Sequence, residues 1–430
     1  MNSFKDYHLK AYINQALDKK GFIKPTKVQE LVFNEAFSNN QSLMVESTTG
    51  SGKTHSFLIP IIQAIDEDVK ECQAVIFAPT RELAEQLYLN VLEITKESDK
   101  EINVQKVVGG SDRQTEIKKF ESTIPQIVVG TIGRIHDLVI TSNVLKIHNA
   151  KNIVIDEADM IFEDKEIVEV DHLMGKFLGE PRFLIFSATI SKGLRSFLNT
   201  YFKNIKKIIL EEKNLTNTNI EHLMLVCKAK SKITVLYELL EMINPYLCLI
   251  FVNTKDLVDS LALEIAENGY NVGKLHGDMD DRERKQMLRR INNLEFKYVV
   301  CSDIAARGID IQGVSHVINY ELPKDVEFYI HRTGRTARFD QTGQAWTLYS
   351  YDDDRYVKDL RNKGLIVKFV KLVNKEIIET KLERKTSHSF VKDIESRVHA
   401  KHKMPDKVKP GYKKKRKELI FLTFNSILYW

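Results

Sequence analysis

The sequence predicts two tandem α/β domains, each built around a parallel sheet, followed by a basic C-terminal tail. Short apolar runs alternate with amphipathic stretches in one half of the chain and again in the other. This alternation is typical of buried parallel strands joined by crossover helices. The chain has 430 residues, which is more than one ordinary core holds. Its basic residues gather after the last predicted strand.

In the first half, the apolar runs are short, nearly continuous and rich in β-branched or aromatic side chains. Such runs are typical of strands that are buried on both faces of a sheet. Residues Arg81–Lys96, which lie between two of these runs, have helical spacing. Leu83, Leu87 and Val91 fall on one face of that predicted helix. The predicted strands are Ser42–Glu46, Ala74–Ala78, Gln126–Gly130, Asn152–Ile155 and Arg182–Phe186.

The second half repeats this scheme. Residues Leu257–Glu267 and Asp281–Ile291 have the spacing of helices between further apolar runs. The strand signals stop past about Lys371. The predicted strands are Leu247–Val252, Val272–Leu275, Tyr298–Cys301, His316–Tyr320 and Ala345–Tyr349.

Changes in composition set the expected limits of the domains. Residues 211–219 are polar and weakly patterned, so we expect a linker there. One domain is expected over residues 1–210 and a second over residues 220–370. Residues 371–430 form the predicted tail, which is rich in Lys and is expected to be partly helical or disordered.

The net charge of +5 conceals an uneven distribution. Residues 371–418 hold 16 Lys and Arg against 7 Asp and Glu, whereas the rest of the chain holds 48 against 52. Long-range attraction of a polyanion is therefore expected mainly from the tail. The last residues, Leu419–Trp430, carry no charge. They are either a segment that docks on the body or on a partner, or a reading-frame scar.

The cysteines are widely separated and none forms a CxxC pair, so the sequence indicates neither a zinc site nor a disulfide framework. No apolar run approaches the roughly 18 residues of a membrane span. The first residues lack an apolar signal core, so we expect no secretion and a reducing, cytoplasmic location. The cysteines are Cys72, Cys227, Cys248 and Cys301.

A glycine-rich segment after the first predicted strand has the pattern of a phosphate-binding loop. The backbone N–H groups of such a loop cradle phosphates, Lys53 would reach the β- and γ-phosphates, and the Thr54 hydroxyl would ligate Mg²⁺. Ser47 replaces the first glycine of the usual pattern. Taken alone, such a segment also occurs in ordinary turns. The loop runs Thr49-Gly50-Ser51-Gly52-Lys53-Thr54.

Two carboxylates stand at the tip of the predicted strand Asn152–Ile155. Asp156 would hold the metal ion that Thr54 ligates, and Glu157 would activate the attacking water. Either acid alone is also an ordinary solvated strand end. The loop and the two acids together, in this order, predict an enzyme that hydrolyses a nucleoside triphosphate with Mg²⁺.

Further short motifs occur along the chain in a set order. Over roughly residues 1–370, they resemble the DEAD-box RNA helicase family, and the resemblance implies two RecA-like domains. The segment Val408–Lys415 is similar to the tail of the bacterial cold-shock branch of that family. The motifs are Gly21–Gln29, Pro79–Gln86, Gly109-Gly110, Thr131–Arg134, Asp156–Asp159, Ser187–Thr189, Phe251–Thr254, His276-Gly277, Ser302–Asp310 and Tyr329–Arg338.

The resemblance implies roles for several residues at an ATP site. Gln29 would read the adenine edge with help from Thr26, because a Gln side chain offers adenine one donor and one acceptor. Phe4 would stack on the adenine ring, and Asp310 would contact the ribose. A turn before a helix is the alternative interpretation of Thr26 and the proline before it.

The resemblance also implies that the second domain completes the reaction. Arg335 and Arg338 would act as arginine fingers, which neutralise the charge that grows on the γ-phosphate. An Arg-rich turn is otherwise usually a solvated surface. Four further residues would couple the state of the bound phosphate to the relative position of the two domains. They are Ser187, Thr189, His331 and Arg332.

RNA contacts are implied in both domains. Contacts with phosphate and sugar carry little sequence information, so we expect low sequence specificity, and contacts with the 2′-hydroxyl would favour RNA. Two departures from the family pattern bear on these contacts. Ile132 replaces a usual Pro, which predicts a looser turn, and Asp281 replaces a common Gln. The implied contacts are Thr80, Arg81, Gly110, Thr131, Arg134, Thr254, Gly277 and Arg307.

These roles predict an ATP-dependent RNA helicase, in which ATP and single-stranded RNA close two domains and short duplexes or RNA–protein complexes are locally opened. An ATP-gated RNA clamp without strand separation is one alternative, and a DNA translocase, which Gln29 disfavours, is another. The expected cofactors are ATP and Mg²⁺. The expected partner is structured or duplex RNA, tethered by the basic tail, in ribosomal precursors or with the RNA-decay machinery.

Overall fold

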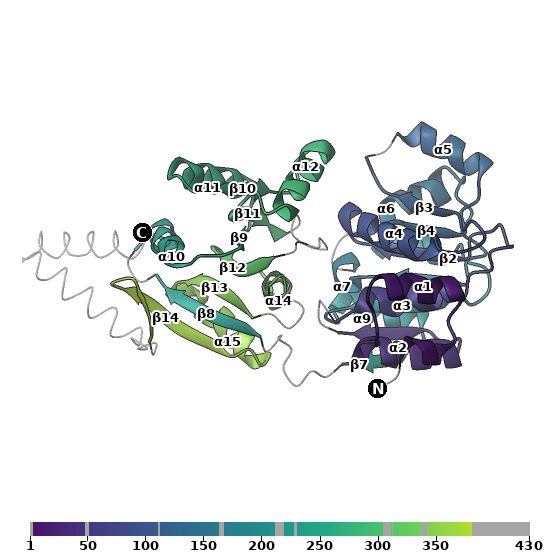
Figure 1. The fold of residues 1–430 in the computed structure, drawn as a ribbon, viewed down its shortest axis with the longest axis horizontal. Coiled ribbons are helices and arrows are strands. Elements are labelled where there is room, and N and C mark those ends of the chain that lie inside the picture. Colours follow the sequence, from purple (N-terminus) through teal and green to yellow (C-terminus); the bar gives the residue numbers. More distant parts are fainter. Residues whose placement is uncertain are drawn as a thin grey trace, which may run out of the picture. The chain divides into compact units, whose positions relative to one another are not determined.

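The computed structural model describes residues 3–47, 51–110, 112–162, 167–210, 219–227, 230–303, 311, 313–336 and 342–380. These residues contain two sheets of mostly parallel strands with flanking helices (Figure 1). The predicted α/β class with two parallel sheets is therefore confirmed. The described residues up to Ile378 belong to one compact unit. The predicted domain limits stay predictions, because the linker apart from Asn219, and the tail from residue 381, lie outside the described residues.

The first sheet has seven strands in the order β3-β4-β2-β5-β6-β1-β7. Every strand predicted for this half is present, whereas β3 and β7 are additional. Two of the four side chains of β3 are only partly buried, and three of the four side chains of β7 are exposed, so neither strand has a continuous apolar run. The strands are β1 Leu43–Glu46, β2 Ala74–Ala78, β3 Val104–Val107, β4 Ile127–Thr131, β5 Asn152–Ile155, β6 Arg182–Ser187 and β7 Lys206–Ile209.

Alternate side chains of the first sheet enter two separate cores. In β2, Ala74 and Ile76 enter a core with α1 to α4, while Val75 and Phe77 enter a core with α5 to α9. Helices therefore cover both faces, and ligands reach the sheet at its strand ends. The helices are η1 Phe4–Tyr7, α1 Ala11–Lys19, α2 Lys27–Ser38, α3 Lys53–Gln63, α4 Arg81–Thr95, α5 Arg113–Ser122, α6 Ile132–His136, η2 Asp137–Thr141, α7 Ala158–Ile161, α8 Ile167–Met174 and α9 Lys192–Tyr201.

The second sheet has eight strands in the order β10-β11-β9-β12-β13-β8-β14-β15. The prediction that strand signals stop near Lys371 is wrong, because β14 continues past this residue and β15 follows it. All four side chains of β15 are exposed at this edge of the sheet, so no apolar run marks it. The strands are β8 Ile220–Val226, β9 Leu247–Val252, β10 Val272–Leu275, β11 Tyr298–Ser302, β12 Val314–Asn319, β13 Gly343–Tyr349, β14 Val367–Val373 and β15 Glu376–Glu379.

Two further cores lie against the second sheet. In β9, Cys248 and Ile250 enter one core, while Leu249 and Phe251 enter the other, as in the first sheet. In the part of the chain that the structure describes, no helix has the length and apolar character needed to cross a membrane. The helices of this half are α10 Lys232–Met242, α11 Lys255–Glu267, α12 Asp281–Asn292, α14 Val326–Thr333, η3 Tyr351–Asp353 and α15 Asp354–Asn362.

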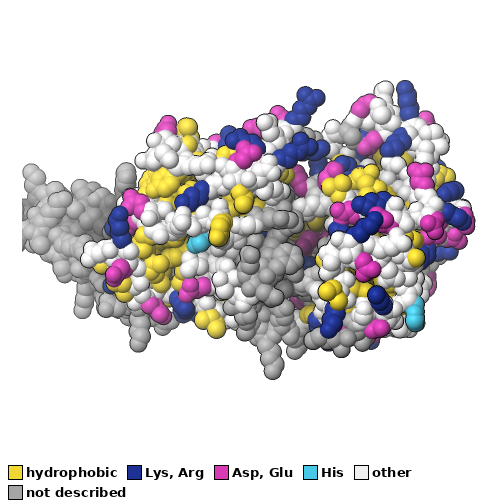
Figure 2. All heavy atoms as spheres, viewed as in Figure 1, with side chains coloured by type: hydrophobic (Ala, Val, Ile, Leu, Met, Phe, Trp, Pro, Cys, Tyr) yellow, Lys and Arg dark blue, Asp and Glu magenta, His cyan; other side chains and the backbone are white. Residues whose placement is uncertain are grey.

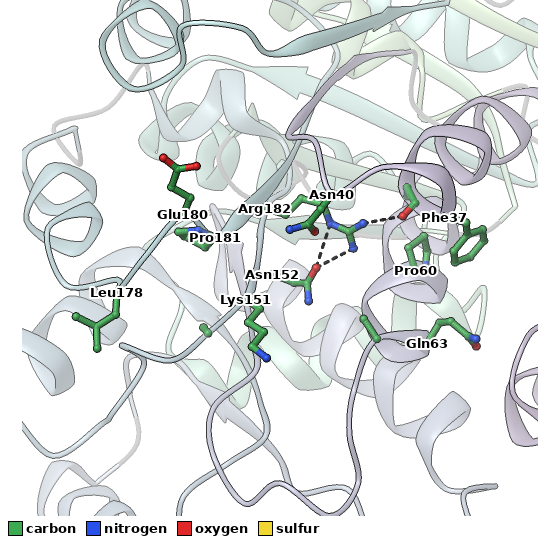
Figure 3. Close-up of a pocket in the computed structure, with 13 residues that line it drawn as sticks. Phe37, Asn40, Pro60, Gln63, Lys151, Asn152, Leu178, Glu180, Pro181 and Arg182 are labelled. Carbon is green, nitrogen blue, oxygen red and sulfur yellow. Dashed lines mark hydrogen bonds between the residues drawn. The ribbon is translucent and has the colours of Figure 1, made fainter.

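A pocket of about 480 Å³ lies where β5 and β6 begin (Figure 3). Arg182 lines it and is buried. Its Nε and Nη2 atoms donate to Asn152 Oδ1 at 3.1 and 2.7 Å, and its Nη1 donates to the Ala36 carbonyl at 2.8 Å. Ala36 lies near the C-terminal end of α2, where free carbonyl groups attract a cation. Arg182 therefore connects β6, β5 and α2. These contacts lie where the strands begin, whereas the predicted site residues lie where the strands end.

Candidate functional site

The predicted site residues of the first half follow its strands at their carboxyl ends. β5, β6 and β1 are parallel neighbours, so the described part of the phosphate loop, Asp156–Asp159 and Ser187–Thr189 meet at the carboxyl ends of these strands. β3, β4 and β2 are also parallel neighbours, and the segments after them hold Gly109-Gly110, Thr131–Arg134 and Thr80-Arg81. The strand order thus divides the edge into a part with the predicted ATP residues and a part with the predicted RNA residues.

Gly52 lies where the phosphate loop enters α3, with a φ of +95°. A Cβ atom there would lie 2.9 Å from Thr26 Oγ1 and 2.9 Å from Gln29 Nε2, so only glycine fits. The Nε2 atom of Gln29 donates to the Gly52 carbonyl at 3.1 Å, and its Oε1 accepts from the Thr26 N–H at 2.9 Å. The residues predicted to bind adenine are thus joined to the phosphate loop.

Two aromatic side chains in the N-terminal part of the chain differ in exposure. Phe4 is buried, and its ring packs on Phe33 with the ring centroids 6.2 Å apart. Phe22 is 37% exposed and packs edge-on against His55, the residue after Thr54. The predicted stacking role of Phe4 stays a prediction. Phe22 belongs to the motif at residues 21–29 and received no role there, yet its accessible ring adjoins the first turn of α3.

Lys53 and Glu157 face each other at this edge, with Lys53 Nζ 3.6 Å from Glu157 Oε1. Their side chains are only 7% and 13% exposed. Among the described residues, neither Lys53 Nζ nor Glu157 Oε2 has a hydrogen-bond partner. Buried polar atoms are nearly always paired, so these two atoms indicate a site that a polar ligand and water complete.

Asp156 is buried beside Glu157, and its Oδ1 accepts the Glu157 N–H at 3.0 Å. Burial, with the Glu157 charge as the second cause, raises the pKa of Asp156 to about 7. A divalent cation would oppose this shift by favouring the carboxylate. Asp156 and the Thr54 hydroxyl offer oxygen ligands of the kind that Mg²⁺ prefers, so these residues fit the predicted metal.

Asp159, the last acid of this motif, received no role from the sequence but has several partners. Its N–H donates to Ser187 Oγ at 3.1 Å, and its Oδ2 accepts the Thr189 hydroxyl at 3.0 Å. The same Oδ2 lies 3.4 Å from His331 Nε2. Burial alone would raise the pKa of Asp159, but the interactions with His331, Lys53 and Thr189 together outweigh burial and hold this pKa at about 2. Three of the four predicted coupling residues are thereby brought together.

Arg332, the fourth predicted coupling residue, is 2% exposed and has a full set of partners in its own half of the chain. Its Nη2 donates to Asp303 Oδ2 at 2.7 Å and to Asn253 Oδ1 at 2.9 Å. Its Nη1 donates to Asn319 Oδ1 at 3.2 Å and to the Glu321 carbonyl at 2.6 Å. Arg332 therefore joins the ends of β9, β11 and β12, and any coupling role acts through these strand ends.

Arg335 follows α14 and is 7% exposed. Its Nε donates to the His331 carbonyl at 3.3 Å, so the predicted arginine finger is held one helical turn after the histidine that approaches Asp159. Its predicted role toward the γ-phosphate stays a prediction. The predicted residues outside the described part of the chain are Thr49, Gly50, Arg307, Asp310 and Arg338.

The predicted RNA residues Thr80 and Thr254 occupy matching positions. Thr80 Oγ1 accepts the Leu83 N–H at the start of α4, and Thr254 Oγ1 accepts the Leu257 N–H at the start of α11. Both hydroxyls cap a helix at the carboxyl end of a strand. Each helix N-terminus directs further N–H groups toward this edge, which suits a phosphate.

Other predicted RNA residues surround α4 and α6. Gly110 has a φ of +91°, and a Cβ atom at the preceding Gly109 would lie 3.1 Å from Arg81 Nη2, so this loop packs closely on Arg81. Arg134 donates to Glu116 Oε2 at 2.9 Å and to Asp137 Oδ2 at 3.0 Å. Its charge is therefore already paired within the protein.

Ile132, which departs from the family pattern, is buried at 1% exposure. It begins α6, after Thr131, and its side chain belongs to the core between the sheet and α5 to α9. The packing of Ile132 in this core therefore constrains the turn, which the sequence predicted to be looser because the usual Pro is absent. Gly277 follows β10, and Asp281 is the first residue of α12.

Comparisons with known proteins agree with these motifs. The pattern of the DEAD/DEAH box helicase family matches residues 26–197, and that of the helicase conserved C-terminal domain matches residues 231–340. The chain is 42% identical to the DEAD-box ATP-dependent RNA helicase CshB of Listeria monocytogenes, over 96% of this chain and 95% of that one. It is 40% identical to CshB of Bacillus subtilis, over 96% and 94%. The structure of S. cerevisiae Dbp5 bound to RNA and ADP BeF3 is similar, with a TM-score of 0.78 and 27% identity over 86% and 96%.

The chain therefore belongs to the DEAD/DEAH box helicase family. Its two sheets with flanking helices have the tandem RecA-like fold implied by the motifs. The predicted similarity to the cold-shock branch is confirmed, because CshB relatives from several bacteria align with most of the chain.

Proposed function

We propose that the protein is an ATP-dependent RNA helicase that couples ATP binding and hydrolysis to the local separation of short RNA duplexes or the remodelling of RNA–protein complexes. The facing pair of Lys53 and Glu157, each with a buried atom that has no hydrogen-bond partner in the described residues, carries this proposal. Relatives named as ATP-dependent RNA helicases, and a similar structure with RNA and ADP BeF3, support it.

In the proposed reaction, Lys53 binds the β- and γ-phosphates of ATP, and Gln29 binds the adenine. Thr54 and Asp156 would hold Mg²⁺, and the bound ion would neutralise part of the phosphate charge. Glu157 orients the attacking water and accepts a proton from it. The partially shielded position of Glu157 suits this task, because few other groups compete for its Oε2 atom.

Arg335 supplies a second cation in this proposal and acts on the charge that develops on the γ-phosphate. It follows His331 in the chain, and His331 approaches Asp159, which also holds Ser187 and Thr189. Loss of the γ-phosphate would therefore disturb a connected set of polar contacts that includes residues of both halves. We propose that this set of contacts couples the presence of the γ-phosphate to the affinity for RNA.

RNA is bound, in this proposal, along the strand ends that carry Thr80, Arg81 and Gly110 in the first half, and Thr254 and Gly277 in the second. Helix N-termini and glycine loops bind the sugar–phosphate backbone, so sequence specificity is low. Structured RNA in ribosomal precursors or RNA-decay assemblies in the cytoplasm is the proposed partner.

A strand-displacement assay tests the proposal. The wild-type protein is expected to release the short strand of a tailed RNA duplex with ATP. Glu157→Gln is expected to bind ATP and RNA but to lose about 10²–10⁴-fold in ATP turnover, because the water loses its proton acceptor. Both ATP turnover and strand release are measured on the same RNA.

The alternative function is an ATP-gated RNA clamp, which hydrolyses ATP in response to RNA without separating strands. RNA-stimulated turnover by the wild-type protein with no strand release would establish the clamp and reject the helicase. Normal turnover in Glu157→Gln would instead remove Glu157 from the chemistry.

A further inference from the structure

One face of α12 carries a row of exposed basic side chains, Arg282, Lys285 and Arg289. Their spacing of three and four residues places them on one side of the helix. The opposite side holds buried Arg284 and Ile291, so the row points away from the domain. Figure 2 shows Lys and Arg side chains gathered over the position that α12 has in Figure 1.

Within the described residues, none of the three side chains forms an ion pair that would neutralise the charge of this row. Neighbouring basic residues behave differently, because Lys274 pairs with Asp259 at 2.5 Å and Arg290 with Glu295 at 2.8 Å. Three unpaired cations on one face repel one another, and a bound polyanion would relieve this repulsion.

The row also lies close in the chain to residues that are predicted to bind RNA. β10 ends at Leu275, the predicted RNA residue Gly277 follows, and α12 begins at Asp281. Arg284, on the buried side of α12, forms an ion pair with Glu82 in the first turn of α4, directly after Thr80 and Arg81. α12 is therefore next to segments of both halves that are predicted to bind RNA.

We propose that Arg282, Lys285 and Arg289 form an RNA-backbone track that holds the part of a bound RNA extending beyond the contact at Gly277. At a rise of about 1.5 Å per residue, the row spans roughly 10 Å along the helix. The phosphates of one strand repeat about every 3.4 Å along a duplex axis, so the row is long enough for about three of them. This inference rests on the proposed RNA-binding function.

RNA is favoured over a protein partner by the composition of this face. None of the described side chains of α12 is an exposed large hydrophobic residue, whereas the core of a protein interface needs aromatic or aliphatic anchors. Cations without such anchors are typical of contacts with phosphates.

The test replaces all three residues in the full-length chain, as Arg282→Gln, Lys285→Gln and Arg289→Gln. A matched control removes the same charge from exposed positions around α15, as Lys324→Gln, Arg355→Gln and Lys358→Gln. RNA affinity is measured against salt concentration with a non-hydrolysable ATP analogue. The RNAs are a short single strand and the same strand extended by a duplex.

The track predicts that the α12 variant binds the extended RNA more weakly, with a slope of log Kd against log salt that is smaller by about 2, since each lost phosphate contact contributes about 0.7–0.9. Affinity for the short strand should be retained, and the control should match the wild type on both RNAs. Lys285→Glu alone should show the same direction of change.

An unchanged salt slope in the α12 variant overturns the track, and so does equal weakening on the short and extended RNAs. These outcomes differ from failure of the proposed function. In that case, the wild-type protein itself would bind RNA no more tightly with the ATP analogue than without it.

Discussion

Gly52 shows how closely the adenine and phosphate ends of the proposed ATP site are packed. Its positive φ and its contacts with Thr26 and Gln29 leave no room for a Cβ atom. Gly179 also has a positive φ, of +73°, but a Cβ atom at Gly179 would meet nothing within 4 Å. Substitutions at these two glycines therefore distinguish the effect of backbone strain on stability from the effect of displaced side chains on ATP binding.

We expect Gly179→Ala to lower the free energy of unfolding by about 1–2 kcal/mol through left-handed backbone strain alone, with ATP affinity unchanged. Gly52→Ala carries the same strain and also displaces Thr26 or Gln29, so ATP affinity should fall about tenfold or more, which corresponds to about 1.4 kcal/mol. Urea unfolding and titration with a fluorescent ATP analogue measure both quantities. Equal ATP affinity in the two variants would mean that Gln29 and Thr26 do not position the nucleotide.

The sequence identifies single residues well where a short pattern has one chemical purpose. Lys53, Asp156 and Glu157 are named by their motifs, and the structure brings Lys53 and Glu157 face to face. The internal partners of Arg332 could not be predicted in the same way. Asn253 and Asp303 follow different strands, and only the folded sheet brings them to one guanidinium.

At the scale of elements, strands that are buried throughout are predicted from the sequence, whereas the edge strands β3, β7 and β15 and the inner strands β8 and β14 are not. β5 and β9 are buried throughout, so burial on both faces leaves a clear pattern. β7 and β15 lie at the edges of their sheets, and most of their side chains are exposed. An edge strand is specified by its neighbour more than by its own composition, which is why the predicted end near Lys371 was too early.

Arg182 tests how the start of β6 is anchored to β5 and α2. Arg182→Met removes the donors to Asn152 and to the Ala36 carbonyl, and is expected to destabilise the protein by about 1–3 kcal/mol for each acceptor left unpaired. Lys151→Met at the neighbouring exposed position is the control and should stay within about 0.5 kcal/mol of the wild type. Chemical denaturation measures both. Equal stability of the two variants would show that water in the pocket replaces the guanidinium.

His222 in β8 gives the second sheet a predictable sensitivity to acid. Burial lowers the pKa of His222 to about 4, and its Nδ1 lies 3.0 Å from the Tyr329 hydroxyl. Between pH 6.5 and pH 4, His222 binds a proton in the unfolded protein but not in the folded protein. The contribution of His222 to the free energy of unfolding is therefore fully present above pH 6.5 and is lost as the pH falls towards 4. His222→Gln should therefore reduce the pH slope of the unfolding free energy by up to about 1.4 kcal/mol per pH unit in this window. Identical slopes would contradict a buried, neutral His222.

At the scale of the whole molecule, strand order explains why distant motifs act together. β5, β6 and β1 are neighbours in the sheet. The acids that follow β5, the hydroxyl side chains of Ser187 and Thr189, and the described part of the phosphate loop therefore lie together at the carboxyl ends of these strands. In the second sheet, β10, β11 and β9 adjoin and are followed by Gly277, Asp303 and Asn253. The motif order predicted the family, but the contact of Asp159 with His331, which links the two halves, required the structure.

The proposed function requires ATP and RNA to favour the same closed arrangement of the two halves. If they do, each ligand must raise the affinity for the other by the same factor. The direct measurement is the affinity of Glu157→Gln for a short fluorescent single-stranded RNA, with and without saturating ATP and Mg²⁺, by fluorescence anisotropy. We expect ATP to tighten RNA binding by about 5–150-fold, equivalent to about 1–3 kcal/mol of coupling. The same RNA affinity with and without ATP would contradict closure by both ligands.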